Sequence, residues 1–118
     1  MQHIETGKQG ETIAERYLLE KGWRIAERNY RAGRGEVDLI AWPHDRLLVF
    51  VEVKTRNSDH FGGPEEAVTL KKQDRLARTA GYYMEQIGYD WEIRFDIISV
   101  ILKNGTLQEI RHIEDAFF

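Results

Sequence analysis

Three carboxylates and one lysine lie in two neighbouring apolar segments of this sequence. Glu36 and Asp38 stand in the first segment, and Glu52 and Lys54 stand in the second. Carboxylate oxygens suit hard cations such as Mg²⁺ and Mn²⁺, and such cations activate water and polarise phosphodiesters. A lysine beside them stabilises negative charge that develops during hydrolysis. The four residues therefore indicate a metal-dependent phosphodiesterase site.

Strand geometry decides whether these side chains meet. Side chains two residues apart in a strand share a face, which puts the two acids of the first segment together, with Val37 and Leu39 opposite. The same rule puts Glu52 beside Lys54. Residues 48–51, before Glu52, are all apolar, which is typical of a central strand covered on both faces.

The Glu-x-Lys pattern alone is weakly specific in a chain with 31% charged residues. Residues 92–94 and 109–111 both read Glu-Ile-Arg and are most simply alternating charges on exposed strand faces. A salt bridge across one face of the sheet is the structural alternative for Glu52 and Lys54. The apolar lead-in to Glu52, absent before the other two, favours a functional role because a buried carboxylate needs a partner.

Apolar periodicity and turn signals predict the elements that position these residues. Helices are expected at 6–21 and 70–87, and strands at 23–30, 36–42, 47–55, 91–102 and 106–113. Leu70 and Gly81 are among the residues of the second helix expected to point inward. The order α-β-β-β-α-β-β predicts an α/β fold, a central mixed β-sheet flanked by helices.

The length of the chain predicts one domain spanning residues 1–118. Apolar residues make up 42% of it, enough to fill a core, and the absence of cysteine excludes disulfides and thiol chemistry. The apolar runs are far shorter than the roughly 20 residues that span a bilayer. The first residues lack the basic start and apolar stretch of a secretory signal. We expect a cytoplasmic protein with no membrane partner.

Charge is distributed unevenly along the chain. Seventeen basic and twenty acidic residues give a formal net charge of −3, so any binding of nucleic acid must come from local basic patches. One such patch precedes the first acidic segment, and another lies at helical spacing in the second predicted helix. A solvated surface is the alternative for each residue. The candidate DNA contacts are Arg28, Arg31, Arg34, Arg56, Lys71, Lys72, Gln73 and Arg75.

A resemblance to a known family covers nearly the whole chain. Its main motifs are Gly35-Glu-Val-Asp-Leu-Ile-Ala41 and Val49-Phe-Val-Glu-Val-Lys-Thr-Arg56. Further matching residues are Gly7-Lys-Gln-Gly-Glu11 with Ala14 and Tyr17-Leu18, Glu27-Arg-Asn-Tyr-Arg31, Ala67-Val68 with Lys72 and Gln73, and Arg94-Phe-Asp96. These residues resemble the YraN family of bacterial proteins. That family is similar to the PD-(D/E)xK nucleases, with the restriction-endonuclease-like fold and closest likeness to archaeal Holliday junction resolvases.

The resemblance implies a metal-dependent endonuclease that cuts structured or branched DNA in repair or recombination. By position, Asp38, Glu52 and Lys54 match the catalytic Asp, Glu and Lys of the superfamily. Glu11 matches the extra acidic residue that resolvase-like members carry on the first helix, and it would join Asp38 and Glu52 as a ligand of Mg²⁺ or Mn²⁺. A solvated residue on the helix surface is the alternative for Glu11. Val37 stands where the superfamily motif has Pro.

Glu36 is a candidate for a supporting position behind the metal ligands, with a strand-start residue facing water as the alternative. A non-catalytic nucleic-acid- or protein-binding module on the same fold is the alternative function, and the negative net charge favours it slightly. The expected partners are branched DNA and either a second copy of the chain or a helicase-like protein. A C2 homodimer would supply the two active sites that symmetric cutting needs. The terminal pair Phe117-Phe118 is a candidate contact.

The remaining polar residues are interpreted structurally. The four histidines have no metal-ligand spacing and are expected at the surface: His3, His44, His60 and His112. Asp96 stands inside an apolar strand and is expected to be a buried hydrogen-bonding residue rather than a ligand.

Overall fold

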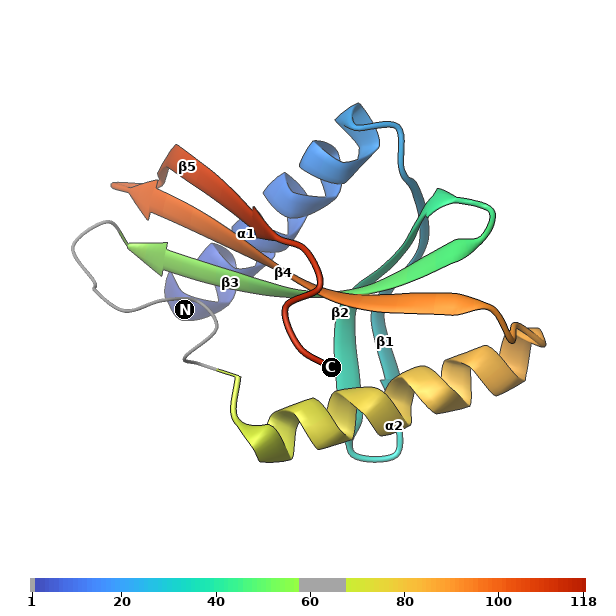
Figure 1. Ribbon diagram of the computed structural model, residues 1–118. Helices are drawn as coiled ribbons and strands as arrows, with labels where there is room; N and C mark the ends of the chain where they lie inside the picture. Colours follow the sequence, from blue (N-terminus) through green and yellow to red (C-terminus); the bar gives the residue numbers. More distant parts are fainter. Residues whose placement is uncertain (1, 58–67) are drawn as a thin grey trace.

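The computed structural model of this chain describes residues 2–57 and 68–118, with side chains from residue 7 onward. The described part contains two helices and five strands in the predicted order (Figure 1). They are α1 (Gln2–Glu20), β1 (Arg24–Ala32), β2 (Gly35–His44), β3 (Leu47–Asn57), α2 (Leu70–Ile87), β4 (Glu92–Lys103) and β5 (Thr106–Ile113). The predicted mixed α/β class is therefore confirmed.

The five strands form one sheet in which spatial order follows chain order, β1-β2-β3-β4-β5. Strands β3 and β4 run parallel, and the other neighbouring pairs run antiparallel. A parallel pair needs a crossover connection, and α2 provides it. Strand β3 occupies the centre and is buried from Leu47 to Glu52, as its continuous apolar run predicts.

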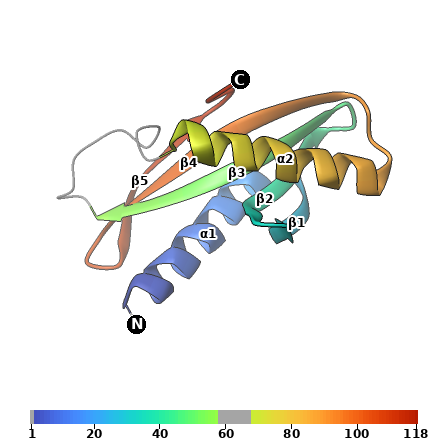
Figure 2. The ribbon, with the colours of Figure 1, turned by 90° about the horizontal axis from the view of Figure 1, so that it is seen from below.

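The helices cover opposite faces of the sheet and give a three-layer arrangement (Figures 1 and 2). On one face, Ala14 and Leu18 of α1 belong to a core cluster with Val49 and Val51. On the other face, Leu76 and Ala80 of α2 pack with Leu48 and Phe50. Alternate residues of β3 thus enter two different cores, which explains why its apolar residues are consecutive.

Local signals set the ends of α2. The Thr69 hydroxyl accepts a hydrogen bond from the backbone nitrogen of Lys72 at 3.2 Å, and Gly88 closes the helix with a φ of 68°. Leu70, expected to point inward, is instead 82% exposed. At 3.6 residues per turn, Leu70 lies about 120° around the helix from the buried Leu76. Gly81 is also exposed, for the same reason.

Asp96 is buried and hydrogen-bonded, as predicted. Its carboxylate accepts hydrogen bonds from Arg94 and from the backbone nitrogen of Asp115, and His112 Nε2 lies 2.7 Å away. The expectation of a surface residue is wrong for His112, because Tyr17 of α1 and Lys21, which follows the end of this helix, cover its Nδ1 side. Lys21 Nζ lies 3.3 Å from His112 Nδ1, and the Tyr17 hydroxyl lies 3.2 Å from the same nitrogen. His44 is exposed, and the side chains of His3 and His60 lie outside the described residues.

The carboxyl-terminal residues fold back over the α2 face of the sheet (Figure 1). The backbone nitrogen of Ala116 donates to the Phe95 carbonyl at 2.7 Å, and the Phe117 ring stacks on the Phe95 ring with centroids 5.5 Å apart. Phe118 remains 74% exposed. Phe117 therefore packs against the core, whereas most of Phe118 faces solvent. In the part of the chain that the structure describes, neither helix is long and apolar enough to cross a membrane.

Candidate functional site

The site begins where β2 separates from β3. The last pair of the β2–β3 ladder on that side is Leu39 with Val51. One residue further, Asp38 Oδ2 accepts a hydrogen bond from the backbone nitrogen of Val53 at 2.7 Å. The carboxylate thus takes the place of a backbone partner, and the two strands part beyond it.

The separation also rotates β2. Val37 packs in the core cluster under α2, whereas Leu39 packs in the cluster under α1. The prediction that these two residues share a face is therefore wrong. Simple alternation fails here because the strand leaves the ladder that would hold it in register. Glu36 and Asp38 nevertheless line the same pocket.

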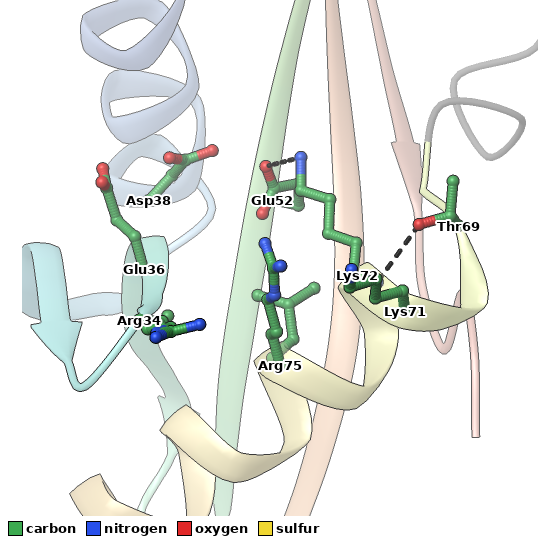
Figure 3. Close-up of a pocket in the computed structure, with 10 residues that line it drawn as sticks. Arg34, Glu36, Asp38, Glu52, Thr69, Lys71, Lys72 and Arg75 are labelled. Atoms are coloured by element: carbon green, nitrogen blue, oxygen red, sulfur yellow. Dashed lines mark hydrogen bonds and ion pairs between the residues drawn. The ribbon is translucent and has the colours of Figure 1, made fainter.

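This pocket has a volume of about 590 Å³ and lies between β2, β3 and the start of α2 (Figure 3). Acidic side chains from the two strands line one side of the pocket. Glu11 of α1 does not line it but interacts electrostatically with these acids. We call Glu11, Glu36, Asp38 and Glu52 the acidic cluster. Basic side chains line the other side: we call Arg34, Lys71, Lys72 and Arg75 the basic wall. Figure 3 shows the Arg75 guanidinium pointing into the space between Glu52 and the β2 acids.

Two glycines allow the close packing that brings these walls together. A Cβ on Gly35 would lie 1.8 Å from the Thr79 hydroxyl, so only glycine lets the start of β2 approach α2 this closely. A Cβ on Gly10 would lie 1.8 Å from the Thr55 hydroxyl, so α1 approaches β3 in the same way. Each glycine immediately precedes a member of the acidic cluster.

Glu52 is the most enclosed member of the acidic cluster, with a side chain 9% exposed. Two ammonium groups face its Oε1, that of Lys72 at 3.1 Å and that of Lys54 at 3.7 Å. Burial, followed by the contact with Lys72, lowers the pKa of Lys54. Burial acts to lower the pKa of Lys72 too, but its contacts with Lys54 and Glu52 outweigh burial and raise it.

The pKa of the Asp38 carboxyl is strongly raised. Burial and then the charge of Glu52 raise its pKa to about 7, against the hydrogen bond from Val53. Burial also raises the pKa of Glu11, with Glu36 and Glu52 adding repulsion. Among the described residues, no three members of the acidic cluster have oxygens within 4.8 Å of one another. The cluster stores mutual repulsion that a cation would relieve.

Asn29 is a site residue that the sequence interpretation missed. It lies on β1 between Arg28 and Tyr30, which pair with Leu39 and Val37, so it stands opposite Asp38. Its φ is 51°, in the left-handed region, and its side chain hydrogen-bonds Glu11 and lowers that carboxyl's pKa. An asparagine within a predicted strand was the available signal, since asparagine tolerates this conformation better than other residues.

The structure brings only part of the candidate DNA-binding set to the pocket, namely the four residues of the basic wall. Arg28 forms a bidentate ion pair with Glu15 of α1, with both N···O distances 2.6 Å, and does not line the pocket. Arg31 contacts Glu36 at 3.1 Å. Gln73 donates to the Val68 carbonyl. Arg56 lies near the end of β3, outside the pocket lining.

A second group with metal-binding potential lies on the far part of the sheet. Asp96, His112 and Glu114 have ligand atoms within 4.8 Å of one another and are the only such trio in the described part of the chain. Arg94 already pairs with Asp96 at 2.8 Å and with Glu114 at 3.4 Å. Since this guanidinium supplies the positive charge, the geometry fits a structural network better than a metal centre.

Comparisons with known proteins agree on one family. The model described as "Uncharacterised protein family UPF0102" matches residues 10–100, which include the whole acidic cluster and basic wall. A UPF0102 protein of Thermodesulfovibrio yellowstonii is 44% identical over 118 residues, all of both chains. One of Bacteroides thetaiotaomicron is 46% identical over 117 residues, 99% of this chain and 95% of the relative. One of Solibacter usitatus is 51% identical over 100 residues, 82% of this chain and 75% of the relative.

Proposed function

This chain belongs to the UPF0102 family, the family expected from its motifs under the name YraN, and we propose that it is a metal-dependent nuclease. Its substrate in this proposal is structured or branched DNA, and its fold is a small form of the restriction-endonuclease-like fold of PD-(D/E)xK enzymes. The supporting observation is the pocket itself. It sets buried carboxylates on β2 and β3 opposite the basic start of α2.

The donor set fits Mg²⁺ or Mn²⁺. All four members of the acidic cluster offer hard carboxylate oxygens, and the chain has no cysteine that would favour a softer metal. Asp38 and Glu52 would hold the cation, with Glu11 behind them and Glu36 in support. The cation would supply Lewis-acid polarisation and a nucleophilic water near neutral pH.

The basic wall would bind the DNA backbone. Lys71 and Lys72 occupy the first turn of α2, which contains no acidic residue. Cations at a helix amino terminus oppose the helix dipole, so their presence costs stability and favours a role in binding anions. Arg75, one turn later, and Arg34, from the β1–β2 turn, would orient neighbouring phosphates.

Lys54 would act at the reacting phosphate. It is on the same strand as Glu52 and is largely buried. When water adds to phosphorus and one P–O ester bond breaks, negative charge grows on the non-bridging oxygens before the phosphomonoester and alcohol separate. An ammonium held in place beside the cluster stabilises that charge without reorganising.

A non-catalytic DNA- or protein-binding module is the second candidate. The distances within the acidic cluster favour this second candidate, because no three of its described carboxylates have oxygens within 4.8 Å of one another. A homodimer or a complex with a larger DNA-processing protein is the proposed assembly, and the exposed Phe118 ring is available for that contact.

A cleavage panel separates the two candidates. Single-stranded, duplex, flap and four-way-junction DNA are incubated with the protein and Mg²⁺ or Mn²⁺. We expect metal-dependent cleavage of the branched substrates, none by Asp38→Ala, and wild-type cleavage by Glu92→Ala, a control at an exposed carboxylate outside the pocket lining. Binding should weaken steeply with added salt, since phosphate contacts release counter-ions. Binding without cleavage under every condition would favour the second candidate.

A further inference from the structure

The first turn of α2 places an ammonium group on the carboxylate that the proposed function assigns to the metal. Figure 3 shows Lys72 reaching Glu52, with Lys72 Nζ 3.1 Å from Glu52 Oε1. Lys54 Nζ lies farther from the same oxygen, at 3.7 Å. The Glu52 side chain is almost enclosed. A divalent cation that approaches Glu52 therefore meets a positive charge already bound there.

The side chains of Lys54 and Lys72 differ in how easily they can move away from Glu52. Lys54 belongs to the central strand β3, and its side chain is 17% exposed. The side chain of Lys72 is 39% exposed and lies on the pocket surface. The α2 cap holds Lys72 by its backbone nitrogen, through Thr69 Oγ1. The Lys72 side chain can therefore turn away without disturbing the start of the helix.

We propose that Lys72 is a resident counter-ion of Glu52, which a divalent cation displaces and which then serves as a phosphate contact. The inference rests on the proposed function. Glu52 Oε1 already faces two ammonium groups, so a divalent cation there would add a third and doubly charged centre, and the repulsion expels the more exposed ammonium, that of Lys72. Lys71 and Arg75 line the pocket on either side of Lys72, so the released ammonium joins an existing phosphate-binding surface.

Displacement of Lys72 by the metal couples the binding of the metal to the binding of DNA. Metal binding frees a cation for DNA, and DNA that holds this cation keeps it from returning to Glu52. By thermodynamic linkage, each ligand raises the affinity for the other by the same factor. A lysine that only contacted DNA would leave the metal affinity of the free protein unchanged.

The test measures Mn²⁺ binding to the full chain by calorimetry, with no DNA present. Lys72→Met keeps the length of the side chain and removes its charge, so we expect Mn²⁺ to bind about three- to tenfold tighter than to the wild type. Lys72→Arg should bind like the wild type. Lys71→Met is the matched control: this lysine lies on the same pocket but outside the ion pairs described for Glu52, and its Mn²⁺ affinity should not change.

A second experiment measures the coupling between Mn²⁺ binding and DNA binding. Anisotropy with a phosphorothioate-substituted four-way junction gives DNA affinity with and without Mn²⁺. The gain caused by Mn²⁺ should shrink in Lys72→Met and persist in Lys71→Met. Unchanged or weaker Mn²⁺ binding by Lys72→Met, with normal binding by the wild type, would overturn the counter-ion role alone. A wild type that binds no Mn²⁺ would overturn both this inference and the proposed function.

Discussion

Asp38 and Val53 are joined by a hydrogen bond in which a side chain replaces a strand partner, with Asp38 Oδ2 accepting from the Val53 nitrogen at 2.7 Å. The bond fixes one oxygen of the carboxylate and ends the pairing of β2 with β3. The second oxygen remains for another ligand. The contact that opens the pocket therefore also orients one of its acids.

Asp38 should make stability depend on pH. Its pKa is raised from 3.8 to about 7, so the folded protein holds this proton more tightly than the unfolded chain does. The contribution of this group to stability is therefore complete below pH 4 and is lost as the pH rises to about 7. We expect Asp38→Asn, in EDTA, to be more stable than the wild type by about 1 to 3 kcal/mol at pH 8. Urea unfolding across pH 4 to 8 should show this difference shrinking toward acid pH.

The same variant should not cleave DNA, because the amide is a poor ligand for a divalent cation. A marked loss of stability in Asp38→Asn at pH 8 would mean that the carboxylate is structural, and the site assignment would then be wrong.

Lys54→Ala should separate catalysis from metal binding. The variant keeps every carboxylate and removes the charge that stabilises the reacting phosphate, so turnover should fall by about 100-fold or more. Mn²⁺ binding, measured by calorimetry, should not weaken, because every carboxylate is kept and a competing ammonium is removed from Glu52. Cleavage at the wild-type rate would refute the catalytic role of this lysine and weaken the superfamily assignment.

Gly35→Ala should damage the site through packing alone. The new Cβ would collide with the Thr79 hydroxyl and lie 3.2 Å from the Arg75 carbonyl, so β2 and α2 must move apart. We expect a loss of about 1 to 3 kcal/mol in thermal or urea unfolding, together with weaker Mn²⁺ binding. Gly81→Ala is the control. It has open space in an exposed part of α2 and should gain about 0.5 to 1 kcal/mol.

Asn29 should act through its amide rather than its backbone. Asn29→Gly tolerates the left-handed conformation but loses the hydrogen bond to Glu11. We therefore expect near-wild-type stability with reduced Mn²⁺ affinity. Asn29→Ala should show the same affinity loss and, in addition, a destabilisation of about 1 kcal/mol from its positive φ. Equal Mn²⁺ affinity in all three proteins would exclude a role in positioning Glu11.

Asp96 should be structural. Asp96→Ala leaves Arg94 and His112 without their shared partner in a buried setting, so we expect a loss of about 3 to 5 kcal/mol. Below the melting temperature, Mn²⁺ affinity at the pocket should not change. If Asp96→Ala instead abolished binding of divalent ions by the protein, the metal centre would lie here and not between β2 and α2.

The sequence could predict whatever depends on local patterns. Strand alternation and the apolar run before Glu52 were enough to bring Glu52 and Lys54 together on a central strand. The predicted bounds of the second helix, 70–87, agree with those of α2 in the structure.

Features that depend on distant parts of the chain could not be predicted in this way. His112 is enclosed because the end of α1 packs against β5. Arg28 pairs with a glutamate of α1 rather than facing the pocket. Val37 changes face because Asp38 breaks a ladder between two strands.

The topology of the sheet also orders the events of folding. Leu39 and Val51 of the β2–β3 hairpin are 12 residues apart, whereas every pair in the parallel β3–β4 ladder, such as Leu47 with Glu92, spans 45 residues (92 − 47). Short loops close faster than long ones, so the hairpin brings the carboxylates of Asp38 and Glu52 together before the crossover delivers Lys72. We therefore expect Lys54, which lies on β3 itself, to balance the charge of Glu52 from the start, and Lys72 to add its charge only when α2 packs on the sheet.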